Sequence, residues 1–169
     1  VKIAKPTDAK TYGIAVIFQE FTLVPHLSVA QNIFLGREAK GRWTGLLDQA
    51  SMRSQAQQIL DELEMAIDPD AELVSLGVAQ QQMVEIAKAL SQNAQILVLD
   101  EPTASLSDKE TAKLFEMIAK LKSRGVAMVY ISHRMAEVFS IGDRITVLRD
   151  GRKVASRFPA ETNQDELVS

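Results

Sequence analysis

The chain has 169 residues, of which 46% are hydrophobic and 24% charged, as in one globular domain or a domain with a small satellite. It contains no cysteine, which excludes a disulfide framework, a thiolate metal site and a cysteine nucleophile. Nineteen Lys and Arg against 22 Asp and Glu give a net charge of −3, which argues against nucleic acid as a partner. The longest apolar run, Val126 to Ile131, is far shorter than the roughly 20 residues that span a bilayer.

A short helix and a buried strand come first among the predicted elements. Thr7 to Tyr12 predicts the helix, and the apolar run Ile14 to Phe18 predicts the strand. Gln19 follows at the carboxyl end of that strand. Ser28 then occupies the N-cap position of a second short helix, where its hydroxyl can accept a hydrogen bond from the first turn.

Two amphipathic helices and another strand follow. The first helix, within residues 51–65, has an apolar stripe made of Met52, Ala56, Ile59, Leu60 and Leu63. The second helix has its apolar positions at Met83, Ile86, Ala87 and Leu90. After Asn93 the period changes, and Gln95 to Leu99 predicts a short apolar strand.

The last predicted elements are a helix, a strand and a hairpin. Ser107 and Glu110 form a capping box ahead of an apolar-periodic segment, which marks the start of a helix. Residues 126–131 predict a buried strand. Asp150 and Gly151 lie between two strand-like runs and suit the type I′ turn of a β-hairpin.

The three apolar strands alternate with helices, which predicts an α/β fold with a parallel sheet covered by helices on both faces. Roughly 75 residues separate the first two strands, more than a simple crossover needs, so we expect a helical insertion. Residues 1–20 and 94–169 are assigned to the sheet core, and about 21–93 to a helical lobe.

Polar side chains follow the three predicted strands, where ligands bind in open parallel sheets: Gln19, Asp100 with Glu101, and His133. Each has a plainer interpretation. The acidic pair can be a helix-start signal, the histidine a structural residue, and the glutamine an ordinary strand end. Because all of them lie at the same edge of the predicted sheet, the functional interpretation of each is strengthened.

The chemistry that fits these residues is phosphoryl transfer. An apolar strand ending in Asp100 can hold Mg²⁺, and the adjacent Glu101 can polarise an attacking water. Gln19 and His133 could orient that water or contact a γ-phosphate. A metalloprotease lacks its paired-histidine motif here, and a serine hydrolase lacks its G-x-S-x-G turn.

The ordered set of segments resembles an ATP-binding cassette of the ABC family. The Q-loop, signature, Walker B, D-loop and H-loop are matched in that order by Val16–Glu20, Leu76–Gln82, Asp100–Thr103, Ala104–Ser107 and Tyr130–Arg134. Phe18 to Phe21 and Leu27 to Gly36 are similar to the first cassette of bacterial sugar importers of the ribose, xylose and galactose type. The resemblance covers nearly the whole chain.

The resemblance implies a P-loop NTPase-like core with a helical lobe, and ATP and Mg²⁺ as cofactors. It implies that Glu101 is the catalytic base, that His133 and Gln19 orient the reacting groups, and that Asp100 and Gln19 hold Mg²⁺. It implies a head-to-tail partner cassette, permease subunits contacted after the Q-loop and, indirectly, a periplasmic sugar-binding protein. The expected location is cytoplasmic, peripheral on the inner face of the cell membrane.

The signature segment departs from the usual family pattern. The phosphate-facing residues implied there are Gly77, Val78, Ala79 and Gln80, with Ser107 from the D-loop. Gly77 stands where the family has serine, and Ala79 where it has glycine. A helix start still follows, so its free N–H groups can face a phosphate. The lost hydroxyl bond to a charged phosphate corresponds to about 1.5–3 kcal/mol.

No G-x-x-x-x-G-K-S/T motif occurs in the sequence. We therefore expect a cassette that lacks its amino-terminal Walker A part, with an exposed sheet edge. Without those phosphate-binding groups, the 169-residue chain should bind ATP weakly and should not hydrolyse it.

Three functions are compatible with the motifs. The first is a fragment of the ATPase subunit that powers sugar import. The second is a non-hydrolysing module that lends its signature to a partner's P-loop; the presence of Glu101 and His133 favours the first over this. The third, a DNA-repair or chromosome-structure ATPase, would carry long coiled coils, and no sustained heptads occur here.

Overall fold

The computed structural model describes residues 2–39, 46–164 and 166. Its helices and strands, in chain order, are α1 (Pro6–Thr11), β1 (Ile14–Ile17), α2 (Val29–Ile33), α3 (Gln49–Glu62), α4 (Val78–Leu90), β2 (Ile96–Asp100), α5 (Asp108–Ser123), β3 (Ala127–Ile131), α6 (Met135–Ile141), β4 (Ile145–Arg149) and β5 (Arg152–Arg157). Short 3₁₀ helices lie at Leu73–Ser75 and Pro159–Glu161.

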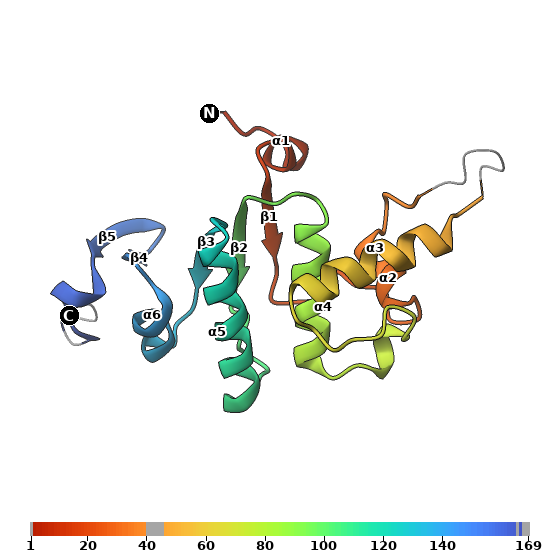
Figure 1. Ribbon diagram of the computed structural model, residues 1–169. Coiled ribbons are helices and arrows are strands. Elements are labelled where there is room, and N and C mark those ends of the chain that lie inside the picture. Colours follow the sequence, from red (N-terminus) through yellow and green to blue (C-terminus); the bar gives the residue numbers. More distant parts are fainter. Residues whose placement is uncertain (1, 40–45, 165, 167–169) are drawn as a thin grey trace.

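The sheet has the order β1-β2-β3, and both strand pairs are parallel. Ile17 pairs with Leu99, and Asp100 pairs with Ile131, so the three strands end at one edge. Figure 1 shows them side by side between the helical lobe and the hairpin. The predicted α/β class and parallel sheet are confirmed.

One face of this sheet is covered, and the other is open. Side chains alternate between the faces of a strand. Leu97 and Leu99 point into the core, to which α5 contributes, whereas Val16 on β1 is 43% exposed and Val129 on β3 is 50% exposed. Phe18, just after β1, is 54% exposed. The expectation that both faces are covered, and that the strands of residues 14–18 and 126–131 are buried, is wrong for the described residues.

The helical lobe consists of α2, α3 and α4, and α4 brings it against β1. Its helices meet through residues on their predicted apolar stripes, such as Met52, Leu60 and Ile86, all of which are almost fully buried. These residues belong to the same core cluster as Leu97 of the sheet. The division of the chain into sheet core and lobe stays a prediction, since one core runs through both.

The carboxyl-terminal part forms the predicted hairpin. Asp150 and Gly151 have φ values of 51° and 71°, as a type I′ turn requires, and they join antiparallel β4 and β5. Helix α6, between β3 and this hairpin, was not among the predicted elements. Within the described ranges, no helix is both long and apolar enough to cross a membrane.

Candidate functional site

The turn after β2 brings Glu101 toward β3. Asp100 is the last residue of β2, and Glu101 has a left-handed backbone with φ 47°. The Glu101 N–H donates to the Ile131 carbonyl oxygen at 2.9 Å, which ties the turn to the end of the neighbouring strand. A non-glycine residue in this conformation costs about 1–3 kcal/mol, so the surrounding contacts must hold it.

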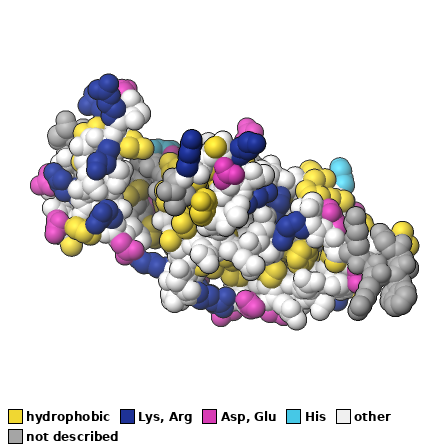
Figure 2. Space-filling model, turned by 90° about the horizontal axis from the view of Figure 1, so that it is seen from above, with side chains coloured by type: hydrophobic (Ala, Val, Ile, Leu, Met, Phe, Trp, Pro, Cys, Tyr) yellow, Lys and Arg dark blue, Asp and Glu magenta, His cyan; other side chains and the backbone are white. Residues whose placement is uncertain are grey.

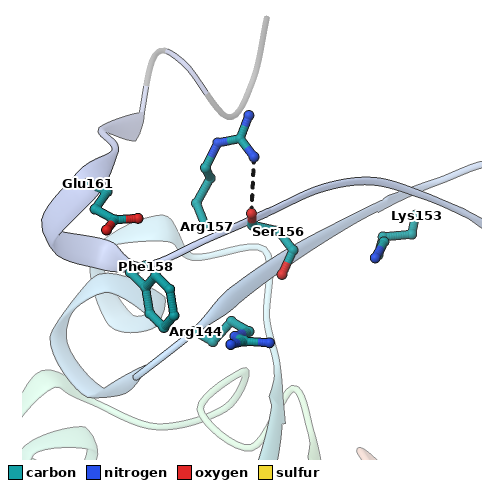
Figure 3. A pocket seen from close by; sticks show the side chains of 6 residues that line it. All are labelled: Arg144, Lys153, Ser156, Arg157, Phe158 and Glu161. Carbon is teal, nitrogen blue, oxygen red and sulfur yellow. Dashed lines mark hydrogen bonds between the residues drawn. The ribbon is translucent and has the colours of Figure 1, made fainter.

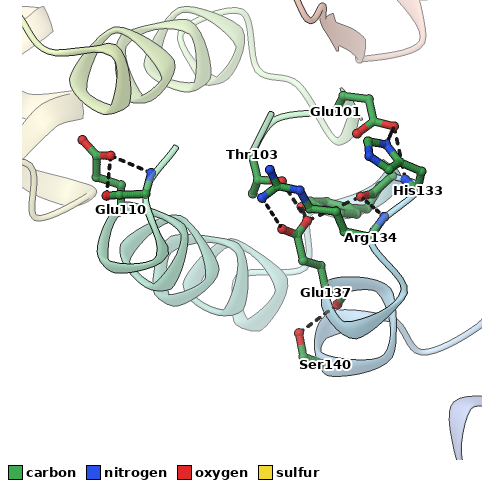
Figure 4. Close-up of polar contacts among 10 residues, drawn as sticks. Glu101, Thr103, Glu110, His133, Arg134, Glu137 and Ser140 are labelled. Carbon is green, nitrogen blue, oxygen red and sulfur yellow. Dashed lines mark hydrogen bonds and ion pairs between the residues drawn. The ribbon is translucent and has the colours of Figure 1, made fainter. Parts of the chain in front are cut away.

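Glu101 and His133 are in direct contact at the carboxyl edge of the sheet (Figure 4). Glu101 Oε1 lies 2.8 Å from His133 Nδ1 and accepts the His133 backbone N–H at 3.2 Å. The Glu101 side chain is 20% exposed, whereas that of His133 is 78% exposed. Glu101 Oε2 is buried and has no hydrogen-bond partner among the described residues. The pair thus leaves one carboxylate oxygen unsatisfied and one imidazole open to solvent.

Gln19 is not part of this contact. It lies beyond the end of β1 with an exposed side chain, and no hydrogen bond joins it to Asp100, Glu101 or His133. Asp100 is half-buried at the end of the central strand, next to Glu101. The structure therefore assembles Glu101 and His133 directly and leaves Gln19 separate on the first strand's end.

The acidic groups at this edge could hold Mg²⁺ only together with water or substrate phosphates as further ligands. No cluster of three or more His, Asp or Glu side chains that could hold a metal is found in residues 2–39, 46–164 and 166. Mg²⁺ usually keeps several waters and takes one or two carboxylates plus substrate phosphates. Asp100, a single half-buried carboxylate at the end of β2, fits that pattern.

The amino-terminal end of α4 is open. Gly77 is its N-cap, and the Gly77 N–H donates to Gln80 Oε1 at 3.2 Å. Gly77, Val78 and Gln80 are exposed, and Ala79 is half-buried. A Cβ atom at Gly77 would meet only Gln80 Oε1 at 3.9 Å, so the site has room for a serine side chain.

Ser107 has a capping role at the start of α5. Its backbone N–H and its hydroxyl donate to Glu110 Oε2 at 2.9 and 2.6 Å. These hydrogen bonds lower the pKa of Glu110 from its ordinary value. The predicted capping box is present, and the hydroxyl predicted to face a nucleotide is used within the chain.

A buried carboxylate behind the site was not predicted. Glu137 of α6 is 9% exposed and accepts hydrogen bonds from Thr103, Tyr130 and Arg134 (Figure 4). The sequence signal was weak, because α6 has only seven residues and no long apolar stripe. An acidic residue four positions after His133 is the only hint in the sequence.

A second buried carboxylate, Glu85, lies in α4 and is 6% exposed. It accepts hydrogen bonds from the backbone N–H and the hydroxyl of Thr22, which follows Gln19. Its signal was a charged residue between Val84 and Ile86 in an otherwise apolar helix face. The apolar spacing of that helix predicts only a core face, without a polar contact.

A cavity of about 610 Å³ lies at the hairpin, away from the sheet edge (Figure 3). Its lining includes Arg144, Lys153 and Arg157. The Arg144 guanidinium lies 5.0 Å from the centre of the Phe158 ring, and Arg157 donates to the Ser156 carbonyl oxygen at 3.1 Å. Two of these three cations therefore already have partners within the hairpin. Figure 2 shows positive, negative and hydrophobic side chains interspersed on the face seen from above.

The sequence matches one known protein family. The sequence model of the family described as ABC transporter matches residues 3–104, which is more than half of the chain. The chain belongs to the ABC transporter family. The matched residues include the Q-loop and Walker B segments, and the family resemblance is thereby confirmed.

Curated relatives match nearly the whole chain. The ribose import ATP-binding protein RbsA of Hahella chejuensis is 53% identical over 95% of this chain and 32% of that protein. RbsA of Corynebacterium glutamicum is 52% identical over 97% of this chain and 32% of its own length. The chain thus spans about a third of the length of these relatives.

Solved cassettes share the fold. The ADP conformation of an ATP-binding cassette of an ABC transporter has a TM-score of 0.77 and 26% identity, and the match covers 93% of this chain and 65% of that one. A post-hydrolysis dimeric cassette bound to ADP and Pi has a TM-score of 0.71 and 26% identity, with 92% and 68% covered. The predicted P-loop NTPase-like α/β fold is confirmed.

Proposed function

We propose that this chain is part of the ATP-binding and ATP-hydrolysing subunit that powers sugar import in an ABC transporter. The observation that carries the proposal is the contact of Glu101 with His133 at the carboxyl edge of the sheet. The names of the relatives, ribose import ATP-binding proteins, support the substrate class.

In this function Glu101 is the catalytic base. Its Oε1 is held by the backbone and ring of His133, which leaves Oε2 as the acceptor for a proton from the attacking water. A buried carboxylate oxygen without a donor is costly, so a water that reaches it gains a hydrogen bond. A positioned general base contributes about 10²–10⁴-fold to a rate.

In this proposal, His133, Gln19 and Asp100 bind the phosphate and Mg²⁺ and orient the attacking water. His133 leaves most of its ring in solvent, where it can contact the γ-phosphate and the water, and Gln19 is exposed just beyond the end of β1. Asp100 is the carboxylate that would hold Mg²⁺, with Gln19 as a second ligand. When bound, Mg²⁺ supplies neutralisation of the phosphate charge.

The signature segment and D-loop serve a composite site in this proposal. The N–H groups of the first turn of α4, which begins at Val78, face the phosphate of a nucleotide held by a second cassette, with Gly77 to Gln80 and Ser107 of the D-loop as the contacting residues. Permease subunits contact the segment after the Q-loop, at the inner face of the cell membrane. A periplasmic sugar-binding protein acts on the same transporter only indirectly.

The test uses the complete gene product, because the 169 residues contain no G-x-x-x-x-G-K-S/T motif. Glu101→Gln keeps the size and hydrogen-bonding capacity of the side chain but removes the basic carboxylate. Single-turnover ATP hydrolysis should fall by about 10²–10⁴-fold, with Mg-ATP affinity nearly unchanged.

Hydrolysis by Glu101→Gln close to the parent rate would refute this assignment. Exposed Glu116 is the control position, since Glu116→Gln makes the same chemical change within α5 and not at the sheet edge. The non-hydrolysing alternative predicts that even the parent protein shows no turnover.

A further inference from the structure

Glu137 is a hydrogen-bonding hub behind the sheet edge. Its Oε2 accepts the Thr103 hydroxyl at 2.8 Å and the Tyr130 hydroxyl at 2.7 Å, and the Ser132 hydroxyl lies 3.4 Å from the same oxygen. Its Oε1 accepts from Arg134 Nη1 at 3.2 Å. Both oxygens of this carboxylate are therefore occupied.

Tyr130 lies on β3, and the other donors come from the two turns that carry Glu101 and His133. Thr103 is in the turn that follows β2, two positions after Glu101, and is fully buried. Ser132 and Arg134 flank His133, and the Arg134 N–H also donates to the Ser132 hydroxyl at 3.0 Å. Figure 4 shows the Glu137 side chain reaching between the two turns.

Glu137 is held as a carboxylate. Burial alone would raise its pKa, but the hydrogen bonds from Tyr130, Thr103 and Arg134 outweigh burial and lower the pKa from its ordinary value. Burial, together with the negative charge of Glu137, raises the pKa of Tyr130. The Tyr130 hydroxyl therefore stays protonated and donates its hydrogen bond, and the Glu137 carboxylate accepts hydrogen bonds at both oxygens.

We propose that Glu137 is a positioning residue for ATP hydrolysis, which fixes the turn of Glu101 against the turn of His133. It touches neither reacting group: it acts through Thr103 on one side and through Ser132 and Arg134 on the other. The proposal rests on the proposed function, because it assigns Glu137 a part in the reaction of Glu101 and His133.

The hub can be weakened without changing Glu137 itself. Thr103→Val is nearly isosteric and removes one donor, whereas Thr103→Ser keeps the hydroxyl. In the complete gene product, Thr103→Val should lower kcat by roughly 10- to 100-fold, because small misplacements of catalytic groups cost rates of this order. KM for ATP should change less than about twofold, and Thr103→Ser should keep most of kcat.

Glu137→Leu removes both acceptor oxygens of the carboxylate and should lower kcat at least as far as Thr103→Val does. The matched control is Asp143→Asn, since Asp143 follows α6 and pairs with Lys122 of α5 but contacts neither turn. Asp143→Asn should leave kcat unchanged. Equal kcat for Thr103→Val and Thr103→Ser, or a loss of kcat in Asp143→Asn as large as that in Thr103→Val, would overturn the proposal.

A spectroscopic test in the complete gene product without nucleotide is independent of ATP hydrolysis. Nitrogen NMR of His133 reports whether its Nδ1 is held by Glu101, as the 2.8 Å contact indicates. Glu137→Leu and Thr103→Val should shift the Nδ1 signal toward that of Glu101→Gln, while Asp143→Asn should not. An unchanged signal in Thr103→Val and Glu137→Leu would refute the positioning role even where Glu101 is confirmed as the base.

Discussion

Glu85 in the buried face of α4 accepts the backbone N–H of Thr22 at 2.5 Å and the Thr22 hydroxyl at 2.9 Å. Lys88, one turn further along α4, donates to the Thr22 carbonyl oxygen at 3.3 Å. The chain just after Gln19 is thereby fastened to the helix that begins at the signature segment. The two candidate phosphate-contacting regions of this chain are thus linked through a single threonine.

Glu85→Leu should destabilise the protein, because it removes the hydrogen bonds that the buried Glu85 carboxylate accepts from the Thr22 N–H and hydroxyl. The expected loss is about 1–3 kcal/mol of unfolding free energy, measured by urea denaturation. Glu116→Gln, at an exposed position of α5, should change the midpoint little. Equal stability of the two variants would show that the Thr22 contact contributes nothing.

His133→Ala and Asp100→Asn should fail in different ways in the complete gene product. Loss of the ring should slow the single-turnover rate by up to roughly 10²-fold while Mg-ATP binding remains, because the role proposed for the histidine is to orient reacting groups. Asp100→Asn should raise the Mg²⁺ concentration needed for half-maximal activity. A magnesium titration separates the two variants, and identical titrations would contradict the assigned roles.

Gly77→Ser should strengthen the start of α4. A serine N-cap is better than glycine by a few tenths of a kcal/mol, and the nearest atom to the new Cβ is 3.9 Å away. The contrasting variant is Gly142→Ser, whose Cβ would lie 2.8 Å from the Val138 carbonyl oxygen. Thermal unfolding should therefore show a small rise in Tm for the first and a clear fall for the second.

Stability should depend on pH through Glu137. Its pKa is lowered in the folded state, so its contribution is fully present above the ordinary carboxyl pKa and is lost as pH falls through the lowered value. Urea midpoints between about pH 3 and pH 7 should fall on the acid side more steeply in the parent than in Glu137→Gln. Parallel curves would refute this linkage.

The sequence predicted the sheet edge well because its signals are local. Apolar runs, caps and turn residues fix where strands end, and strands that are parallel bring Asp100, Glu101 and His133 to one edge. The direct Glu101–His133 contact follows from that placement, and Gln19 at the same edge remained separate. Local signals therefore predict position along an edge better than they predict side-chain contact.

Other features depend on which distant segments meet. Glu85 and Glu137 are buried because Thr22 and Thr103 supply donors from other parts of the chain, which periodicity does not reveal. The open face at Val16 and Val129 could not be distinguished from a covered one, since both are apolar in sequence. Tertiary context decides burial at these positions.

At Glu101 the left-handed backbone conformation and the carboxylate side chain favour different residue types. Glycine or asparagine adopts φ 47° at a lower cost than glutamate, so backbone energy alone would select against the residue found. Neither glycine nor asparagine carries a basic carboxylate. In the proposed function, Glu101 accepts a backbone cost in order to carry that carboxylate, and screens that select only for thermal stability should drive the position away from glutamate.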